Sequence, residues 1–468
     1  MNICFIAVFD KTYLFANIAK KLQNEDNNIF WITTSRKLKK YLVKSGFVES
    51  RILLIEKSSE YTAKSEVDIE SFEHVNDLSL HKLYFMDRLI KDWKWTDAEK
   101  YFKLTINNVD NFILTNNIKL IFGETTAAHE ILISSLCKYR SINFFNPFTI
   151  RIPGDRFAFF KNRENKDFYE FRSPIYVASD DEIVSLIDDL KAGGKKSTPE
   201  YFIKNNTKPK YNHIFFYTSI KRFISSIQES RHNASMKTLR YHIFKEPKWL
   251  RPINYILSKI FKVFDNQISS KPYVLYTLHK QPEASIDVLG TDWQNQYELI
   301  KHISMNIPSE YNIYVKEHSN ALGDRSVKYL KKIKRIPGVK LISPFADTKK
   351  LILDAEIVFT VSGTVAYEAS LLGVKNITFG NMFFNDFSSS YNHRILEKYT
   401  DILKTNKCTF SISDFEKMKT IYANSFEGII TTDKDLISES SPNLLKIVEA
   451  FKRLINDIKI DEERSDGN

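Results

Sequence analysis

Short apolar runs of strand length alternate with stretches of helical periodicity along this chain, and that alternation restricts its fold more than any other feature. The apolar runs lie at residues 3–9, 28–33, 118–122, 141–145, 273–278, 312–315, 339–342, 357–361 and 376–379. Strands that alternate with helices build parallel sheets covered by helices. Because the pattern stops after the fourth run and starts afresh at residue 273, we predict an α/β protein with two Rossmann-like domains.

The 468 residues are too many for one ordinary core and enough for two such domains with connecting helices. We expect an N-terminal domain at residues 1–190, a basic helical linker at 191–268, a C-terminal domain at 269–405, and further helices with a tail at 406–468. Ligands of open parallel sheets bind beyond the carboxyl ends of the strands. The loops that follow the strands, at a cleft between the two domains, should therefore carry the chemistry.

Cysteine usage and the lack of long apolar segments point to the cytoplasm. Cys4, Cys137 and Cys408 are far apart and form no CxxC pair, which argues against a disulfide framework or a zinc site. The first residues read as a buried strand and not as a signal peptide. No run reaches the roughly 18 apolar residues that a membrane span needs. We expect a cytoplasmic protein.

The net charge of +11 is concentrated in one segment. Residues 191–262 hold 16 Lys and Arg against three acids, which are Glu200, Glu229 and Glu246. Nucleic acid, an anionic membrane surface and an anionic acceptor are partners that suit such a patch. No nucleic-acid-binding motif accompanies the charge. We therefore expect peripheral contact with an anionic membrane and no nucleic-acid partner, with a solvated linker face as the plain alternative.

The run at residues 357–373 joins a buried strand directly to a helix through Ser362, Gly363 and Thr364. The free backbone N–H groups of a helix start, two hydroxyls and a glycine that admits close approach together favour a phosphate group. Glu368 lies one turn into the helix, where its carboxylate suits ribose or base hydroxyls. Ordinary helix capping explains the same residues equally well.

A second polar cluster follows the strand at residues 312–315. It contains Lys316 and His318, with Arg325 shortly after them. The imidazole can donate a hydrogen bond to a phosphate and the two basic side chains can neutralise it. A charged surface loop is the alternative.

A third cluster follows the first strand of the second domain. The segment LHKQPEAS places three polar side chains around a proline turn, which are those of His279, Gln281 and Glu283. A structural turn needs only the proline, so the added imidazole, amide and carboxylate favour a functional site.

Carboxylates also stand at a strand end in the first half. Glu124 follows the strand at 118–122, and Glu130 lies in the next helix. A carboxylate in such a place suits a general base or a nucleophile. Asp10, after the first strand, is a weaker candidate, and a capped helix with a partly buried Glu is the alternative.

The sequence gives little sign of a metal site. His129 precedes Glu130, but the second histidine of a zinc-protease motif is missing four residues later. Asp433-Lys-Asp435 is better explained as a helix cap than as a metal-binding pair. We expect no metal and no cofactor.

Taken together, LHKQPEAS, YVKEHS…GDR and TVSGTVAYEASLLGV resemble the C-terminal half of the capsular-polysaccharide synthesis glycosyltransferases, a two-domain (GT-B) family that includes the Kdo transferases of capsule assembly. The resemblance is strong over residues 273–384 and weaker at 122–130 and 151–156. In that family, the histidine of a His-Pro motif and a Ser/Thr loop bind the phosphate and ribose of a CMP-activated sugar. The resemblance passes these roles to His318, Ser362, Gly363 and Thr364. The chain departs from the pattern at Ser319, where the family has proline.

The resemblance implies a glycosyltransferase of capsular polysaccharide or lipopolysaccharide synthesis that needs no metal. Its donor would be a nucleotide sugar, CMP-linked Kdo or a nonulosonate, held by the C-terminal domain. Its acceptor, a glycan or a glycolipid, would lie on the side of the N-terminal domain. A CDP-polyol phosphotransferase, a UDP-sugar transferase and a non-catalytic polysaccharide-binding or export component remain as alternatives.

Overall fold

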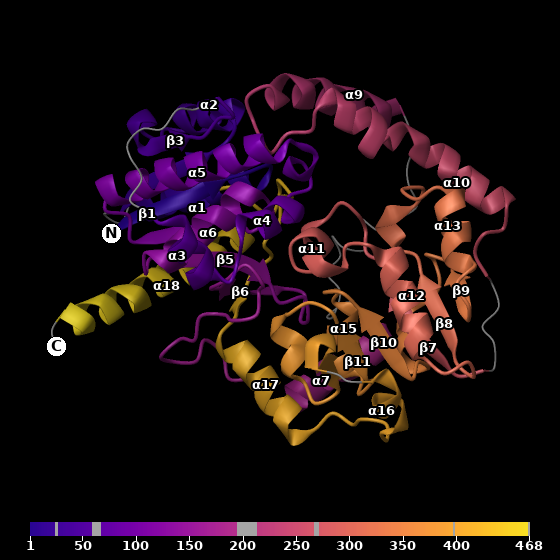
Figure 1. Cartoon of the computed structure of the whole chain (residues 1–468). Coiled ribbons are helices and arrows are strands. Elements are labelled where there is room, and N and C mark those ends of the chain that lie inside the picture. The colour runs from indigo at the N-terminus through magenta and orange to yellow at the C-terminus, as the bar shows by residue number, and fades with distance from the viewer. Residues whose placement is uncertain (24–26, 59–66, 194–212, 266–270, 396–397, 467–468) are drawn as a thin grey trace. The chain divides into compact units, whose positions relative to one another are not determined.

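The computed structural model describes residues 1–23, 27–58, 67–193, 213–265, 271–395 and 398–466. The chain forms two compact units (Figure 1). The first unit consists of Met1–Ala178, Arg222–Thr238 and Thr420–Asn468, and the second of Ser179–Lys221 and Leu239–Lys419. The chain thus enters each unit more than once, whereas the sequence suggested consecutive domains. Part of the expected basic linker, residues 194–212, lies outside the described residues.

The first unit is built on a seven-stranded sheet with the order β13-β6-β5-β4-β1-β2-β3. Its strands are β1 (Asn2–Ala7), β2 (Asn28–Thr33), β3 (Ile52–Leu54), β4 (Leu120–Phe122), β5 (Asn143–Thr149), β6 (Arg156–Phe160) and β13 (Phe426–Glu427). The pairs from β3 to β5 are parallel, whereas β6 runs antiparallel to β5 and β13 antiparallel to β6.

Helices from both ends of the chain complete this unit. They are α1 (Lys11–Gln23), α2 (Arg36–Lys44), α3 (Ile69–Asn76), α4 (Leu80–Met86), α5 (Trp95–Thr115), α6 (Ala128–Tyr139) and α18 (Pro442–Asp466). Figure 1 shows α1 in indigo and α18 in yellow in the same unit, and the two helices pack against each other. Alternate residues of β1 point to this layer, where the ring of Phe5 lies near those of Phe15 in α1 and Phe451 in α18.

The second unit is built on a six-stranded sheet with the order β12-β11-β10-β7-β8-β9, in which all neighbouring strands are parallel. Its strands are β7 (Tyr273–Thr277), β8 (Asn312–Lys316), β9 (Val339–Ile342), β10 (Ile357–Thr360), β11 (Asn376–Thr378) and β12 (Ser390–Asn392). One face is covered by α12 (Gln296–Asn306) and α13 (Val327–Lys334), and the other by α14 (Thr348–Leu353) and α15 (Val365–Leu371).

Further helices of the second unit are α7 (Asp180–Ala192), α10 (Arg251–Ile260), α11 (Ala284–Asp287) and α16 (Tyr399–Lys404). Two helices, α9 (His213–Ser230) and α17 (Ile412–Ala423), cross from one unit to the other. Among the described residues, none of the helices combines the length and the apolar character that a lipid bilayer would require of a span.

The two sheets confirm the predicted α/β class with two Rossmann-like units, and each of the nine apolar runs contributes a strand. In both sheets, the chain first builds strands to one side of its starting strand and then returns to the other side. This reversal falls between β1 and β4 in the first unit and between β7 and β10 in the second. Open parallel sheets bind their ligands at such switch points.

Candidate functional site

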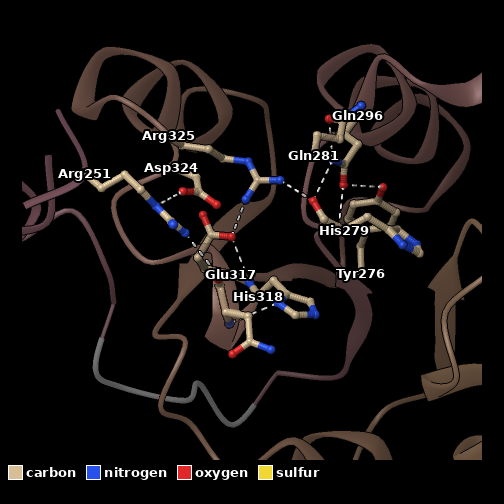
Figure 2. A network of polar contacts seen from close by, with 10 residues as sticks. Arg251, Tyr276, His279, Gln281, Gln296, Glu317, His318, Asp324 and Arg325 are labelled. Carbon is tan, nitrogen blue, oxygen red and sulfur yellow. Dashed lines mark hydrogen bonds and ion pairs between the residues drawn. The ribbon is translucent and has the colours of Figure 1, made fainter. Parts of the chain in front are cut away.

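Three loops meet at the switch point of the second sheet, because the strands that they follow, β10, β7 and β8, are neighbours. His279 follows β7, His318 follows β8, and Ser362 begins the loop after β10. The predicted polar clusters of this half of the chain therefore come together at one edge of one sheet. Figure 2 shows the polar network that joins the loops after β7 and β8.

His279 is a neutral imidazole with a fixed tautomer. Its Nε2 accepts the backbone N–H of Val361 at 3.1 Å and lies 3.0 Å from Oγ1 of Thr360. Burial, with smaller contributions from His318 and Arg325, lowers the pKa of His279 to about 3. Because Nε2 accepts, the ring proton lies on Nδ1, which has no hydrogen-bond partner among the described residues.

His318 has the opposite tautomer. Its Nδ1 accepts the backbone N–H of Asn320 at 3.1 Å, so the proton of the neutral ring lies on Nε2. Burial lowers the pKa of His318 to about 4, with smaller contributions from Arg325, Lys280 and Lys316. The site thus has two uncharged imidazoles. Each has one nitrogen held by the backbone and one N–H for which the described residues provide no acceptor.

A buried ion pair joins the loops that carry the two histidines. The guanidinium of Arg325 donates to the carboxylate of Glu317 and to the backbone carbonyl of His279 (Figure 2). Glu317 also accepts the backbone N–H of His318 at 2.7 Å. Arg325 was predicted to neutralise a phosphate. Its charge is balanced by Glu317, and its two donors hold the loops after β7 and β8 together.

Gln296, at the start of α12, clamps the loop after β7 from the other side. Its Oε1 accepts the backbone N–H of His279 at 2.7 Å, and its Nε2 donates to the carbonyl of His279 at 3.0 Å and to Oε1 of Gln281 at 2.7 Å. Gln281 in turn donates to the carbonyl of Gln294 at 2.8 Å. Sequence reasoning missed Gln296, because a glutamine in a helix outside the motifs gives no signal of this contact.

The loop after β10 is pinned to its neighbours. Ser362 donates through Oγ to the carbonyl of Ser285, and the N–H of Gly363 donates to Oγ1 of Thr360 at 3.2 Å. A Cβ at Gly363 would lie 2.6 Å from that Oγ1 and 3.4 Å from Cε1 of His279. The close approach of this loop to His279 therefore requires glycine. Thr364 follows and directly precedes α15.

Two other predicted residues lie on the inner side of this loop. Lys316 is buried, and its Nζ donates to the carbonyl of Pro344 at 3.1 Å. Glu368 lies in α15, and burial raises the pKa of its carboxyl to about 7 against the opposing charges of Lys349 and Lys316. These side chains are placed to stabilise the loops, and a direct ligand contact of either one stays a prediction.

Lys280 is a cation that the sequence analysis passed over, although it stands between His279 and Gln281 in the quoted motif. It lies close enough to lower the pKa of His318, and among the described residues it forms no ion pair. Glu283 is exposed just before α11, where it accepts a hydrogen bond from Oγ of Ser285 at 3.2 Å. Both side chains are therefore available to a ligand.

A cavity of about 230 Å³ opens beside the Glu317–Arg325 pair. Tyr255, Lys259 and Lys262 of the segment around α10 line its other side. The candidate site is therefore adjacent to open space with basic side chains, and not sealed by packed apolar residues.

The first unit brings its own carboxylates together at its switch point. Glu124, after β4, forms an ion pair with Lys11 at the start of α1, with 2.7 Å between Oε1 and Nζ. Glu130 is buried and accepts hydrogen bonds from the N–H and Oγ1 of Thr126 and from the N–H of Ala127. Burial and the charge of Glu124 raise the pKa of Glu130 to about 7. Glu130 thus caps α6, whereas Glu124 is the more accessible carboxylate.

Asp433 and Asp435 lie exposed in a turn in which Oδ1 of Asp433 accepts the N–H of Asp435 at 3.0 Å. Across the part of the chain that the structure describes, no three His, Cys, Asp or Glu side chains are grouped as metal ligands.

No protein-family model matches this chain, and no curated protein matches it. Among solved structures, it is similar to two transferases of Thermosulfurimonas dismutans KpsC. The beta Kdo 2,7 transferase matches at 10% identity and a TM-score of 0.32, over 73% of this chain and 87% of that one. The beta Kdo 2,4 transferase matches at 12% identity and a TM-score of 0.33, over 72% of this chain and 88% of that one. The UDP-GlcNAc 2-epimerase of Neisseria meningitidis matches at 11% identity and a TM-score of 0.24, over 98% of this chain and 99% of that one. Similarities of this size identify no activity.

Proposed function

We propose that this chain is a glycosyltransferase that binds a nucleotide-activated sugar at the switch point of its second unit and transfers the sugar to a surface polysaccharide or a glycolipid. The observation that supports this proposal is the pair of neutral histidines with opposite tautomers, His279 and His318, beside Lys280, a cation that forms no ion pair within the described residues. These groups lie where open parallel sheets bind nucleotides.

The chemistry of these groups suits a phosphate that leaves during reaction. A neutral imidazole N–H donates to a phosphate oxygen without adding a second positive charge beside Lys280. Donors that are already oriented lower the barrier most, because they do not have to reorganise as negative charge develops on the leaving group. The backbone bonds to Val361 and Asn320 orient both rings in advance. Lys280 then supplies the one charge that the phosphate needs.

For the donor, we propose a CMP-linked ulosonic sugar, Kdo or a nonulosonate, on the resemblance of the three motifs to capsular transferases. Calorimetric titration with CMP, CDP and UDP tests the site and the nucleotide together. We expect CMP to bind more tightly than the other two nucleotides. We also expect His318→Ala to weaken binding by about 1.5–3 kcal/mol, the usual contribution of a hydrogen bond to a charged group.

Each other outcome has a definite meaning. Preferential binding of CDP or UDP contradicts the CMP-linked donor and favours a polyol or UDP-sugar substrate. If the folded protein binds none of the three nucleotides, the proposal that it is a glycosyltransferase is wrong, and a polysaccharide-binding or export component is favoured. We expect turnover to survive EDTA, because Lys280 balances charge on the phosphate and the neutral imidazoles donate hydrogen bonds to it. Loss of turnover that magnesium restores would contradict that expectation.

A further inference from the structure

The outward face of α10 carries an apolar stripe that the described residues of the second unit leave uncovered. Trp249, one turn before the helix, and Ile253, Ile256 and Ile260 within it are 64%, 47%, 56% and 65% exposed. Their spacing places them on one side of the helix, because residues three and four apart share a face. Phe244, in the helical turn Tyr241–Lys245 further upstream, is 74% exposed. Single exposed apolar residues are normal, but a continuous stripe of this kind marks an interaction surface.

The opposite face of α10 is the one that packs on the unit. Asn254 donates to the carbonyl of Gly323 at 3.1 Å, and Arg251 donates to the carbonyl of Asn320 and pairs with Asp324 (Figure 2). Ser258 is buried on the same side. These polar contacts hold α10 on the second unit. Because they lie on one face of the helix, its isoleucines point away from the core of that unit.

Basic residues surround the stripe. Residues 239–262 contain six Lys and Arg against a single acid, Glu246. Arg240, Lys245 and Lys248 are exposed in the segment that leads into α10, whereas Lys259 and Lys262 line the cavity on the other side of the helix. An apolar stripe with aromatic residues and flanking Lys and Arg is the pattern of helices that lie in the interface of an anionic membrane. The apolar side chains enter the boundary of headgroups and acyl chains, and the basic ones meet the lipid phosphates.

We propose that α10 and the turn before it form a docking surface for an anionic phospholipid bilayer, with Trp249, Ile253, Ile256 and Ile260 inserted and the basic residues on the headgroups. The inference goes beyond the basic charge seen in the sequence, because it assigns binding to one helix and to apolar insertion. It does not depend on the proposed sugar transfer. Since the inner face of α10 holds the loop that follows His318, docking would bring that loop close to the membrane surface.

Flotation of the full-length protein with vesicles tests this proposal without any nucleotide. We expect binding to vesicles that contain phosphatidylglycerol and much weaker binding to phosphatidylcholine alone. The variant Trp249→Ser/Ile256→Ser/Ile260→Ser should bind anionic vesicles about tenfold less than the wild type or weaker still, because apolar burial supplies much of the affinity. Ile412→Ser is the matched control, since Ile412 is 84% exposed elsewhere in the same unit; it should bind like the wild type.

Salt separates the two contributions. Binding of the wild type to anionic vesicles should fall between low and physiological ionic strength, as exposed charges are screened. The binding that remains at physiological ionic strength comes from the inserted apolar side chains, so the triple variant should lack it. Failure of the wild type to bind anionic vesicles would overturn the proposal, as would equal binding by the triple variant. A wild type that is dimeric in light scattering and becomes monomeric in the triple variant would also overturn it, because the stripe would then be a contact between two copies.

Discussion

Among the described residues, the basic side chains around the candidate site differ in whether they already have a partner. Arg325 pairs with Glu317, Arg251 with Asp324, and Lys316 donates to a carbonyl. A cation that is already paired gains little from an added phosphate, because it must give up an existing contact. Lys280 has no such contact, so it should contribute most to anion binding.

We predict that Lys280→Ala weakens nucleotide binding about tenfold, which corresponds to the loss of one charge-assisted hydrogen bond. Lys280→Arg should restore most of the affinity, because it keeps the charge. Lys301→Ala is a suitable control, since Lys301 lies on α12 and pairs with Glu298 at 3.6 Å. Calorimetry with CMP measures all three variants, and unchanged affinity in Lys280→Ala would remove Lys280 from the site.

The lowered pKa values of the two histidines predict how donor binding depends on pH. Both groups have folded-state pKa values of about 3 and 4, below the ordinary value near 6.5. They are therefore neutral from pH 5.5 upward and gain charge only as the pH falls towards 4. The pKa of Glu368, beside the loop after β10, is raised to about 7, so the pH series is measured in Glu368→Gln. In that variant we expect the affinity for a nucleotide sugar, whose phosphate is a diester, to stay constant between pH 8 and pH 5.5. A tenfold rise in affinity as the pH falls over that range would mean that one imidazole becomes charged there, and would contradict the neutral pair.

The two carboxylates of the first unit should behave differently on substitution. Glu124→Gln should reduce turnover by about 10²–10⁴-fold, the usual contribution of a general base, and leave CMP affinity unchanged. Glu130→Ala should instead lower the free energy of unfolding by about 1–3 kcal/mol. The three groups that now donate hydrogen bonds to Glu130 would lose their acceptor. Turnover assays and thermal unfolding separate the two effects. Near-normal turnover in Glu124→Gln would place the base elsewhere.

At the residue scale, the sequence predicted the kind of side chain at each strand end better than its role. His279, His318 and Gly363 were identified because polar residues directly after a buried run stand out. The contact of Lys316 with Pro344 was not foreseeable, because it depends on a backbone group whose position only the fold defines. The capping by Glu130 was one of the two interpretations that the sequence left open.

At the scale of elements, the clamp between α12 and the loop after β7 is the feature most open to test. Gln296 makes its contacts to the backbone of His279 and to Gln281 from a fixed helix start. We predict that Gln296→Ala reduces nucleotide affinity about tenfold, because the loop that carries His279 and Lys280 is no longer held in place. The loss of nucleotide affinity in Gln296→Ala should be larger than its loss of stability alone would explain.

Tyr276→Phe provides the comparison, since the hydroxyl of Tyr276 donates to the same Oε1 of Gln296 at 3.3 Å and, among the described residues, forms no hydrogen bond with the loop backbone. It should affect stability with little change in affinity. If both variants lose affinity in proportion to their loss of stability, Gln296 has no positioning role. Calorimetric binding and melting temperature, measured on the same samples, decide between the two.

Elements were predictable where periodicity was clear and local. The strands β7 to β11 follow the apolar runs closely because fully buried strands leave a continuous apolar signal, whereas the half-buried β12 matches no predicted run. The helices between residues 69 and 115 were not assigned, and β13 was missed. A two-residue strand such as β13 exists only because β6 offers it an antiparallel edge, and no local pattern encodes such pairing.

At the scale of the whole molecule, each unit has a core of its own, although the first is assembled from distant parts of the chain. The sequence predicted helices at 406–468 and placed them in a separate C-terminal segment, but α18 belongs to the first unit. Its apolar face, which includes Leu444, Phe451 and Ile458, completes the core around β1 and β4. A helical pattern shows which residues face a core, but not which of two cores accepts them.

This assembly predicts that a change in α18 destabilises one unit selectively. The ring of Phe451 is fully buried, with its centroid 4.6 Å from that of Phe122 and 5.0 Å from that of Phe159. Phe451→Ala should therefore lower the free energy of unfolding of the first unit by about 3–5 kcal/mol. Leu445→Ala, at an exposed position of the same helix, should change it by no more than about 0.5 kcal/mol.

Scanning calorimetry should show the first unit of Phe451→Ala unfolding at a lower temperature while the transition of the second unit stays where it is, because separate cores unfold separately. CMP binding should persist at a temperature at which only the first unit has unfolded, since every donor-binding residue proposed above belongs to the second. If CMP binding is lost together with the first unit, the donor site needs residues from both units, and its assignment to the switch point of the second unit alone is wrong.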